Sequence, residues 1–551
     1  MKTIIVGGVA GGASAAARLR RLDEQSEIIL LERGEHISFA NCGLPYYIGE
    51  KITEESALTL QTPKSFNARF NIDVRNFSEA IDIDRATKTV TVRNALTGEL
   101  YSESYDKLIL STGAEPVKPP INGIDSDKVF TLRNIPDTLR IKEYIDKKHP
   151  KAAIVVGGGY IGVEMAENLS EAGLEVTLVE LADHVIAPLD FDMASEVHSY
   201  IRSKGIRLIL NNGVKEIIDT KEGLSVVLQN GSIEGDMLIM AVGVRPESGL
   251  AKKAGLALNA RGAIIVNSNM LTSDQNIYAV GDVAEIEDFV TGKKAFVPLA
   301  GPANKQGRIA ADNICGLDSK YTGTQGSSIL KLFDMAVAMT GINESTAKAN
   351  NIDYDKVFLY TGSHASYYPG STNMWVKVLF EKETGKILGA QITGFDGVDK
   401  RIDVLATAIR LGASAKDLTE LELCYAPPFG SAKDPVNMAG YVIENIITGK
   451  VKNFHWHDID ALPRDNSVTL LDVRTRGEVR NGMIDGFMNI PLNELRANIC
   501  HLDKSKPIYV HCRSGLRSYI ACRILAGNGF DAYNLSGGYQ LYETVMNERA
   551  H

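Results

Sequence analysis

Short runs of β-branched and other apolar residues alternate along the N-terminal part of the chain with glycine-rich loops and with segments long enough for a helix. The order of apolar run, glycine loop, helix and apolar run occurs twice, with runs at Lys2–Val6 and Ile28–Leu31 and again at Ala153–Val156 and Val176–Val179. Uninterrupted apolar runs are typical of strands that are buried on both faces of a parallel sheet. The pattern therefore predicts two α/β units, each with parallel strands joined by crossover helices.

The C-terminal part of the chain has a different pattern. From about residue 323 to 450, alternating strands such as Trp375–Phe380 and Ile387–Ile392 are mixed with helices, and no glycine loop is present. A polar stretch, Val451–Asn466, follows, and a further small α/β unit begins with the apolar run at Val468–Asp472. We therefore expect a domain boundary near residues 450–455.

Each glycine loop carries a motif for binding a dinucleotide. In the motif G-x-G-x-x-G, the glycines let the backbone approach a pyrophosphate, and the N-terminus of the following helix faces its negative charge. A carboxylate about 20 residues further on binds the ribose hydroxyls. The second loop fits the motif fully, with Gly157, Gly159 and Gly162 followed by Glu180 at the end of the next strand.

The first loop departs from the motif at one position, where Val9 stands in place of the second glycine. Gly7, Gly12 and Glu32 are in their expected places. A single match of this kind is often only a turn, but two complete units with two ribose carboxylates are not expected by chance. The sequence therefore predicts two Rossmann-like dinucleotide-binding domains.

Composition and charge exclude several other classes of protein. The 551 residues are 44% hydrophobic and 23% charged, which is ordinary for a chain of several globular domains. The net charge of −9 argues against a nucleic-acid-binding protein, and no apolar run approaches the roughly 18 residues of a membrane span. The six cysteines include no C-x-x-C pair, so we expect no disulfide framework, zinc ribbon or thioredoxin-type site. Sparse, unpaired cysteines favour a cytoplasmic protein.

Two more segments connect the dinucleotide units to a known family. Tyr105–Pro116 reads YDKLILSTGAEP and Asn276–Ala284 reads NIYAVGDVA, and both resemble the strand-and-turn closures of the flavoprotein disulfide reductases. The resemblance runs from residue 1 to about 445, and it implies FAD on the first unit, NADH on the second and a C-terminal dimerisation domain that makes a homodimer. By this resemblance the residues that would contact FAD are Gly7, Ala10, Gly11, Gly12, Glu32, Arg33, Thr112, Gly113, Asp282 and Ala300. Those that would contact NADH are Gly157, Gly159, Tyr160, Ile161, Gly162, Glu180 and Gly243.

Glu180 bears on the choice of nicotinamide cofactor. Its carboxylate would repel the 2′-phosphate of NADPH, and the following Leu181-Ala182 supplies no arginine to bind that phosphate. We therefore expect NADH rather than NADPH.

The chemistry within this family depends on the cysteine after the second strand, which is Cys42 in the segment SFANCGLPYY. Glutathione-reductase types carry two cysteines spaced C-x4-C, but the fifth residue after Cys42 is Tyr47 and the next cysteine is Cys315. An internal dithiol at that spacing is therefore excluded, and Cys42 would cycle alone through a sulfenic acid, a mixed disulfide or a persulfide. As a thiolate it needs a lowered pKa, which we expect from a helix N-terminus and the adjacent flavin. The alternative is a buried, inert cysteine.

The single-cysteine branch of the family contains NADH peroxidases and oxidases as well as coenzyme A disulfide reductases. Peroxidases carry a histidine just before the final Gly-Gly of the first loop, where this chain has Ala10. The segments SFANCGLPYYIGE and Tyr425-Ala426-Pro427-Pro428 closely resemble those of the coenzyme A disulfide reductases. By that resemblance the residues of the coenzyme A site would be Ser14, Arg18, Arg21, Ser38, Asn41 and Lys433.

The same resemblance assigns a role to two tyrosines. The family places two tyrosines of the partner subunit over the cysteine, and Tyr367 and Tyr425 match them. A tyrosine hydroxyl in that place would hydrogen-bond or protonate a leaving thiolate. Two alternatives stay open at this point: each tyrosine as a packed core residue, and Arg18 and Arg21 as part of a solvated helix face.

Residues from about 455 to 551 resemble a rhodanese sulfurtransferase. The resemblance rests on Leu471–Arg474, Gly486–Pro491, His511–Ser518 and Leu535–Gly538. The chain departs from that family at Met483, where the family has a histidine, outside the catalytic loop.

The strand-to-helix turn that opens at Cys512 would be the sulfurtransferase site. Backbone N–H groups of such a turn form a cradle for an anion, which would stabilise a thiolate and a terminal persulfide sulfur. The spacing of Cys512 and Arg517 is C-x4-R, one residue shorter than the C-x5-R loop of related phosphatases, and it argues against a phosphatase. We expect Cys500 and Cys522 to be packing residues, and the alternative for the domain is a purely structural role. The residues of the cradle would be Arg513, Ser514, Gly515, Leu516 and Arg517.

These observations predict an α/β protein of four parts: an FAD-binding domain at 1–118 and 250–322, an NADH-binding domain at 119–249, an α+β dimerisation domain at 323–450 and an α/β rhodanese domain at 455–551. A flavin thiol reductase joined to a sulfurtransferase implies an NADH-dependent reductase of coenzyme A persulfide and polysulfide, also active on coenzyme A disulfide. One alternative is an NADH oxidase or peroxidase that cycles through a sulfenic acid. The other is a non-catalytic redox sensor whose flavin reports NADH to a partner protein.

Overall fold

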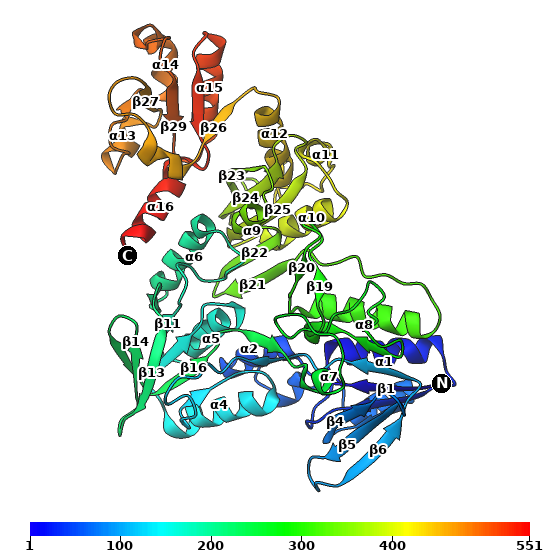
Figure 1. Ribbon diagram of the computed structural model, residues 1–551. Coiled ribbons are helices and arrows are strands. Elements are labelled where there is room, and N and C mark those ends of the chain that lie inside the picture. The colour runs from blue at the N-terminus through cyan, green and yellow to red at the C-terminus, as the bar shows by residue number, and fades with distance from the viewer. The chain divides into compact units, whose positions relative to one another are not determined.

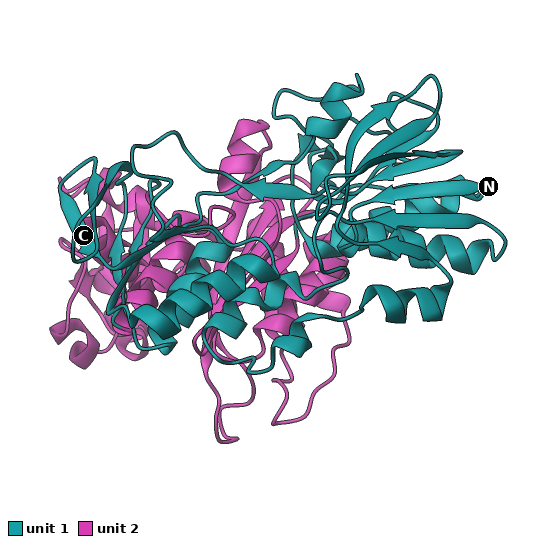
Figure 2. Cartoon of the chain, turned by 90° about the horizontal axis from the view of Figure 1, so that it is seen from below, with its two compact units in different colours: residues 1–182, 205–326 teal, residues 183–204, 327–551 magenta.

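The computed structural model describes all 551 residues and divides into two compact units. One consists of residues 1–182 and 205–326, and the other of residues 183–204 and 327–551 (Figure 2). Helix α6 (Phe191–Ser203) therefore belongs with the second unit, although its neighbours in sequence belong with the first. No helix is both long enough and apolar enough to cross a membrane.

A five-stranded parallel sheet of order β18-β7-β1-β2-β3 carries the first glycine loop. Ile4, Ile5 and Leu30 are fully buried, as strands covered on both faces require. Helices α1 (Ala10–Leu22) and α8 (Ala300–Ile314) pack side by side (Figure 1). A Cβ at Gly307 of α8 would lie 2.3 Å from the carbonyl oxygen of Gly11, so the close packing of the two helices requires glycine there. The strands are β1 (Lys2–Val6), β2 (Glu27–Leu31), β3 (Asp73–Arg75), β7 (Lys107–Leu110) and β18 (Ile277–Ala279).

A second five-stranded parallel sheet, of order β12-β11-β10-β16-β9, carries the second glycine loop. Val155, Leu178 and Ile239 are fully buried in it. In both sheets a central strand leads into the glycine loop and its helix, as the apolar runs predict. The elements are α4 (Ile135–Lys148), α5 (Tyr160–Glu171), β9 (Val129–Phe130), β10 (Ala152–Val156), β11 (Glu175–Val179), β12 (Arg207–Ile209) and β16 (Met237–Met240).

Smaller sheets and short helices complete the first unit. Two antiparallel three-stranded sheets are β4 (Ser78–Asp84), β5 (Thr89–Asn94) and β6 (Leu100–Ser104), and β13 (Val214–Asp219), β14 (Leu224–Leu228) and β15 (Ser232–Gly235). Two-stranded sheets pair β8 (Ala114–Pro116) with β17 (Val244–Pro246), and β19 (Ile286–Glu287) with β20 (Lys294–Ala295). The short helices are α2 (Leu44–Ile48), α3 (Pro63–Phe70), α7 (Gly249–Lys253) and the 3-10 turns η1 (Asn41–Gly43), η2 (Glu55–Leu58) and η3 (Gly281–Val283).

The second unit contains a five-stranded antiparallel sheet of order β21-β22-β25-β24-β23. Its mixture of antiparallel strands and helices is the α+β arrangement that the sequence predicts for this region. The strands are β21 (Ser328–Leu332), β22 (Met335–Gly341), β23 (Tyr354–Gly362), β24 (Asn373–Glu381) and β25 (Ile387–Gly394). The helices that accompany them are α6, α9 (Glu344–Ala349), α10 (Val398–Arg410), α11 (Ala415–Glu420) and α12 (Pro435–Ile447).

The chain ends in a parallel sheet of order β26-β30-β29-β27-β28. Its first strand, β26, begins at Lys452, within the stretch that the sequence marks only as polar. The strands are β26 (Lys452–Phe454), β27 (Thr469–Asp472), β28 (Met488–Asn489), β29 (Ile508–His511) and β30 (Ala532–Leu535). The helices are α13 (Arg476–Arg480), α14 (Leu492–Asn498), α15 (Leu516–Gly527), α16 (Gly538–Ala550) and the 3-10 turns η4 (Trp456–Ala461) and η5 (Ile499–His501).

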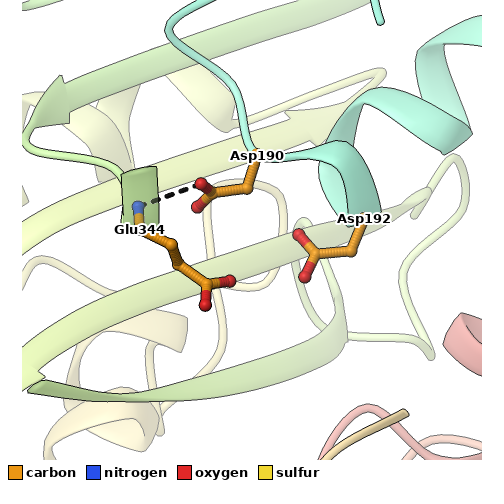
Figure 3. A group of neighbouring side chains, drawn as sticks. All are labelled: Asp190, Asp192 and Glu344. Atoms are coloured by element: carbon orange, nitrogen blue, oxygen red, sulfur yellow. Dashed lines mark hydrogen bonds between the residues drawn. The ribbon is translucent and has the colours of Figure 1, made fainter. Parts of the chain in front are cut away.

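A buried group of charges lies in the second unit. The carboxylates of Asp190, Asp192 and Glu344 point toward one another (Figure 3). The ammonium of the fully buried Lys377 lies 2.8, 2.7 and 2.6 Å from their oxygens. Because that ammonium already supplies the positive charge between the three carboxylates, the group is an ion-pair network and does not offer an open cation site. Trp456 of η4 donates to Asp192 at 3.1 Å, which connects the C-terminal domain to the same network.

Candidate active sites

The first glycine loop is built so that only glycine fits at its closest contacts. Gly7 has φ +100°, and a Cβ there would lie 2.2 Å from the carbonyl oxygen of Ser111. A Cβ at Gly12 would lie 1.9 Å from the carbonyl oxygen of Gly7. The carboxylate of Glu32 accepts hydrogen bonds from the N–H groups of Gly8 and Gly34, at 3.0 and 2.9 Å. The loop therefore offers backbone N–H groups and a fixed carboxylate at the start of α1, a donor set that fits a dinucleotide.

The second loop repeats this construction. A Cβ at Gly157 would lie 2.3 Å from the carbonyl oxygen of Ala241, and one at Gly162 would lie 1.8 Å from the carbonyl oxygen of Gly157. Gly159 has open space around its Cβ position, which leaves room for a pyrophosphate. Glu180 accepts hydrogen bonds from the N–H groups of Gly158 and Ala182, at 2.5 and 2.8 Å.

The other residues predicted to contact the two dinucleotides lie at loop ends and helix starts. Ala10, Tyr160 and Ala300 are the first residues of α1, α5 and α8, and Ile161 follows Tyr160. Gly113 and Gly243 have φ +74° and +109° in turns after strands. These positions are typical of backbone that faces a ligand.

Glu247 organises part of the first site. It forms ion pairs with Arg33 and with Arg133, the second at 2.7 Å, and its carbonyl oxygen accepts from the hydroxyl of Thr112 at 2.6 Å. Asp282 lies in η3, where burial raises the pKa of its carboxyl to about 6. Arg33 and Thr112, both predicted from the sequence, are therefore fixed by a residue that the sequence analysis did not single out.

Cys42 lies in η1, after β2 and its loop. It is an exposed residue, unlike the buried cysteine of the alternative interpretation. The protein around its sulfur raises the pKa of the thiol, and the carboxylates of Glu164 and Asp282 add to the rise. The direction is opposite to the lowering that the sequence analysis expects from a helix N-terminus. The helix that follows, α2, has only five residues and donates no hydrogen bond to the sulfur.

Glu164 is the buried carboxyl that accompanies Cys42. It lies on α5, and burial raises its pKa to about 7. The hydroxyl of Tyr46 donates to it at 3.3 Å. A carboxyl with this pKa changes its charge near neutral pH, within electrostatic range of the cysteine.

A cavity of about 400 Å³ lies between α1, α3, α8 and the loop that leads to Cys42. It brings together four residues that the sequence assigns to coenzyme A, namely Ser14, Arg18, Arg21 and Ser38. The fifth, Asn41, is exposed and does not line it. Residues that the sequence analysis did not predict complete the lining: Ala13, Ala17, Gln61, Phe66, Arg69, Phe70, Asn304 and Arg308.

The charge of this cavity is strongly positive. Arg18 is paired with Asp312 at 2.7 Å. Arg21, Arg69 and Arg308 are exposed and have no carboxylate partner within the chain. The lining therefore presents three uncompensated guanidinium groups, which suits a ligand with several phosphates.

Tyr367 and Tyr425 lie in the second unit, and their hydroxyls are hydrogen-bonded to each other at 2.7 Å. They are 74% and 46% exposed, so neither is a packed core residue. The loops that carry them are joined by a hydrogen bond from the N–H of Ala365 to the carbonyl oxygen of Gly430, at 2.9 Å. Lys433 is exposed on the second of these loops.

Cys512 lies at the end of β29 and the start of the turn into α15. Its buried sulfur accepts hydrogen bonds from the N–H of Gly515 at 3.2 Å and from the hydroxyl of Ser518 at 3.3 Å. Arg513 donates to the amide of Gln540 at 3.1 Å. The turn is thus a cradle whose donors point at the sulfur.

The remaining residues of that turn differ in their exposure. Ser514 is half-buried, and Leu516 is 59% exposed. Arg517 donates to both oxygens of Glu478, at 2.8 and 2.6 Å. Cys522 is buried, as predicted, but Cys500 is exposed, so the expectation that it packs is wrong. Cys500 belongs to the short turn η5, which the apolar pattern does not resolve.

Three comparisons place this geometry among known proteins. Residues 1–307 match the family described as pyridine nucleotide-disulphide oxidoreductase. The chain belongs to this family. Residues 327–435 match the dimerisation domain of pyridine nucleotide-disulphide oxidoreductases, and residues 456–544 match the rhodanese-like domain. The family implies FAD and a nicotinamide dinucleotide as cofactors, and both glycine loops fit such groups.

Individual relatives show which members of the pyridine nucleotide-disulphide oxidoreductases this chain resembles. The coenzyme A disulfide reductase of Staphylococcus epidermidis is 40% identical over 442 residues, which cover 80% of this chain and 99% of that protein. The crystal structure of reduced CoADR-RHD from Bacillus anthracis is 52% identical with a TM-score of 0.97, and the match covers 100% of this chain and 98% of that chain. An NAD-dependent persulfide reductase from A. fulgidus is 36% identical with a TM-score of 0.91, covering 98% and 100%. The resemblance to coenzyme A disulfide reductases followed by a rhodanese domain is confirmed, as is the α/β fold class.

Several residues that shape these sites within the oxidoreductase fold were not predicted. Arg69 and Arg308 reach the cavity from helices far apart in the sequence, and no local motif marks them. Ser518 stands in the quoted segment after Cys512 but was not assigned to the cradle, although its place early in the helix is a usable signal. Glu478 begins α13 with Thr475, and the Thr-x-x-Glu spacing indicates only a helix start.

Proposed function

We propose that this chain is an NADH-dependent flavoprotein reductase of coenzyme A persulfide and polysulfide, also active on coenzyme A disulfide. Cys42 is its redox cysteine, and the rhodanese-like domain carries sulfur on Cys512. The observation that carries the proposal is the arginine-lined cavity, whose wall includes Ser38, on the loop that leads to Cys42.

The cavity favours coenzyme A over small thiols. Coenzyme A carries phosphates on its adenosine end, and three unpaired guanidinium groups supply matching charge and hydrogen-bond donors. Phe66 and Phe70 add apolar surface for a base or a pantetheine arm. A peroxide or oxygen molecule needs neither feature.

The two glycine loops divide the cofactors between them. FAD is assigned to the loop at Gly7 and NADH to the loop at Gly157. The carboxylate of Glu180 accepts hydrogen bonds from two backbone N–H groups, and the next two residues are Leu181 and Ala182. A 2′-phosphate is disfavoured because it would meet this negative charge and no adjacent arginine. The domain bounds proposed with this assignment are 1–118 with 250–322 for FAD, 119–249 for NADH, 323–450 for dimerisation and 455–551 for sulfur transfer, and strand β26 (Lys452–Phe454) extends the sheet of the last domain. When bound, the flavin supplies the two electrons that return Cys42 to its thiolate.

The proposed cycle uses Cys42 as a nucleophile. Its thiolate attacks the sulfane sulfur of coenzyme A persulfide, so that a Cys42–sulfur bond forms, the persulfide bond breaks and coenzyme A leaves as a thiol. Two electrons then break the Cys42 persulfide and release sulfide. On coenzyme A disulfide, attack gives a mixed disulfide on Cys42 and one free coenzyme A.

The tyrosine pair supplies a proton to the departing sulfur. In a homodimer, Tyr367 and Tyr425 of the partner subunit would lie over Cys42, and Lys433 would bind coenzyme A. Their exposure in the single chain and their mutual hydrogen bond leave one hydroxyl proton free to be donated.

The experiment is anaerobic oxidation of NADH by the purified holoenzyme with coenzyme A persulfide, with sulfide counted, beside runs with coenzyme A disulfide and with peroxide. One sulfide per NADH, at a rate above that of the disulfide, is expected. A faster disulfide reaction would make the persulfide reaction secondary. Turnover with peroxide alone would contradict the proposal and favour an NADH peroxidase that cycles through a sulfenic acid.

A further inference from the structure

The loop at Cys512 contains two arginines, Arg513 and Arg517, but the charge of Arg517 is neutralised by a carboxylate. Arg517 forms a bidentate ion pair with Glu478, with N–O distances of 2.8 and 2.6 Å. Hydrogen bonds from Arg517 and Thr475 lower the pKa of Glu478 to about 2, so its carboxylate is charged at neutral pH. The pair is therefore neutral as a whole, while the guanidinium still lies within electrostatic range of the Cys512 sulfur.

The other charges around the loop are also compensated, with one exception. Arg474 is paired with Asp472 at 2.7 Å. Burial lowers the pKa of His511 to about 4, so this histidine is neutral. Arg513 binds only the neutral amide of Gln540. Among these groups, Arg513 alone offers a positive charge without a carboxylate partner.

The edge of the loop is apolar. Leu516 and Ile520 stand one turn apart on α15, and they are 59% and 38% exposed. Leu516 follows Gly515, whose N–H donates to the Cys512 sulfur. An organic group attached to a donor sulfur therefore has apolar surface beside it, whereas a small inorganic dianion gains nothing from that surface.

We infer that Cys512 takes its sulfur from an organic persulfide rather than from thiosulfate, and that Glu478 sets this preference by neutralising Arg517. The inference rests on the proposed function, since it specifies the sulfur donor of the same rhodanese-like domain. The Cys512 thiolate attacks the terminal sulfur of R–S–SH. A Cys512–sulfur bond forms, the S–S bond of the donor breaks, and R–SH leaves with the proton of the persulfide. The charge and the number of electrons are the same on both sides.

The test measures the rate at which Cys512 of the full-length holoenzyme gains one sulfur atom, by intact-protein mass spectrometry. The donors are glutathione persulfide, which carries no phosphate, and sodium thiosulfate, with Cys512→Ser as the blank. The wild-type protein is expected to load from the persulfide at least about tenfold faster. Equal rates from the two donors would overturn the inference, whatever the variants do.

Glu478→Gln removes one charge and keeps the side-chain shape that caps α13. It is expected to raise loading from thiosulfate about tenfold and from glutathione persulfide about threefold, because thiosulfate is a dianion whereas glutathione persulfide with a protonated terminal sulfur carries a net charge of −1, from its two carboxylates and its ammonium. In Glu478→Gln/Arg517→Gln the gain is expected to disappear, and added salt is expected to reduce it. An unchanged ratio of the two donors in Glu478→Gln would contradict the role of Glu478.

Reduction of coenzyme A disulfide by the same preparations separates the two proposals. If that activity is absent while Cys512 loads selectively from the persulfide, the proposed reductase function fails and the donor preference stands. If the disulfide is reduced but thiosulfate loads as fast as the persulfide, the donor preference alone fails.

Discussion

Cys42 and Cys512 stand in opposite surroundings. The sulfur of Cys512 is buried and accepts hydrogen bonds from Gly515 and Ser518, which follow it by three and six residues. Cys42 is an exposed residue, but partial desolvation of its thiol raises its pKa, and the carboxylates of Glu164 and Asp282 add to the rise. One loop thus contains the groups that stabilise its own thiolate, whereas the other depends on groups outside it. A local motif can specify the first kind of site, and only the assembled fold specifies the second.

The largest expected effect is the loss of one activity, but not the other, when either cysteine is replaced. Cys42→Ser should lower NADH-dependent reduction of coenzyme A disulfide by about a thousandfold or more, because it removes the nucleophile. It should leave sulfur loading of Cys512 unchanged. Cys512→Ser should show the reverse pattern. Steady-state NADH oxidation and mass spectrometry of both variants check this, and loss of both activities in either variant would mean that the sites are not independent.

The next effect concerns the arginine-lined cavity near Cys42. Arg21→Ala and Arg308→Ala should each raise the KM for coenzyme A disulfide about tenfold with little change in kcat, because each removes a charged hydrogen-bond donor to a phosphate. Arg261→Ala changes an exposed arginine outside the cavity and is the matched control. Steady-state kinetics measure the KM for coenzyme A disulfide in each variant. An equal KM in all three variants would show that the cavity does not bind coenzyme A.

A smaller effect tests the local stabilisation of Cys512. Ser518→Ala removes the hydroxyl that donates to its sulfur, and it should slow alkylation of Cys512 by iodoacetamide about fivefold. Ser514→Ala is the control, since its hydroxyl makes no hydrogen bond to that sulfur. Equal slowing in the two variants would show that the loop acts as a whole rather than through Ser518.

The smallest effect tests the electrostatics of Cys42. Glu164, with a pKa of about 7, becomes negative as the pH rises through 7, and its charge then raises the pKa of Cys42. Glu164→Gln should therefore increase the alkylation rate of Cys42 about threefold above pH 8 and leave it unchanged below pH 6, where the wild-type carboxyl is neutral. A difference that is the same at both pH values would rule out the charge of Glu164 as its cause.

The comparison also explains how far the sequence could predict the structure. The apolar runs predict β1, β2, β10 and β11 to within one residue, because strands buried on both faces leave a strong pattern. The glycine spacing predicts the two loops, because a Cβ at Gly7 or Gly157 would collide with backbone. Both signals are local, as is the cradle at Cys512.

Features that depend on tertiary packing were missed. Arg308 reaches the cavity only because α8 packs against α1. The pKa of Cys42 is raised, opposite to the direction that the sequence favours, by desolvation in the folded protein and then by the charge of Glu164, which stands on the second dinucleotide unit. Helix α6 belongs with the second unit through long-range ion pairs that no periodicity reveals, such as Arg202 with Glu548.

The central claim is that Cys42 forms a covalent bond with the coenzyme A substrate, and the most direct measurement looks for that bond. The reduced holoenzyme is freed of NADH, given one equivalent of coenzyme A disulfide without oxygen, and analysed by peptide mass spectrometry without a reducing agent. The account predicts coenzyme A attached to the peptide that contains Cys42, and none in Cys42→Ser. Coenzyme A on another cysteine, or an unmodified Cys42 while the disulfide is consumed, would contradict it.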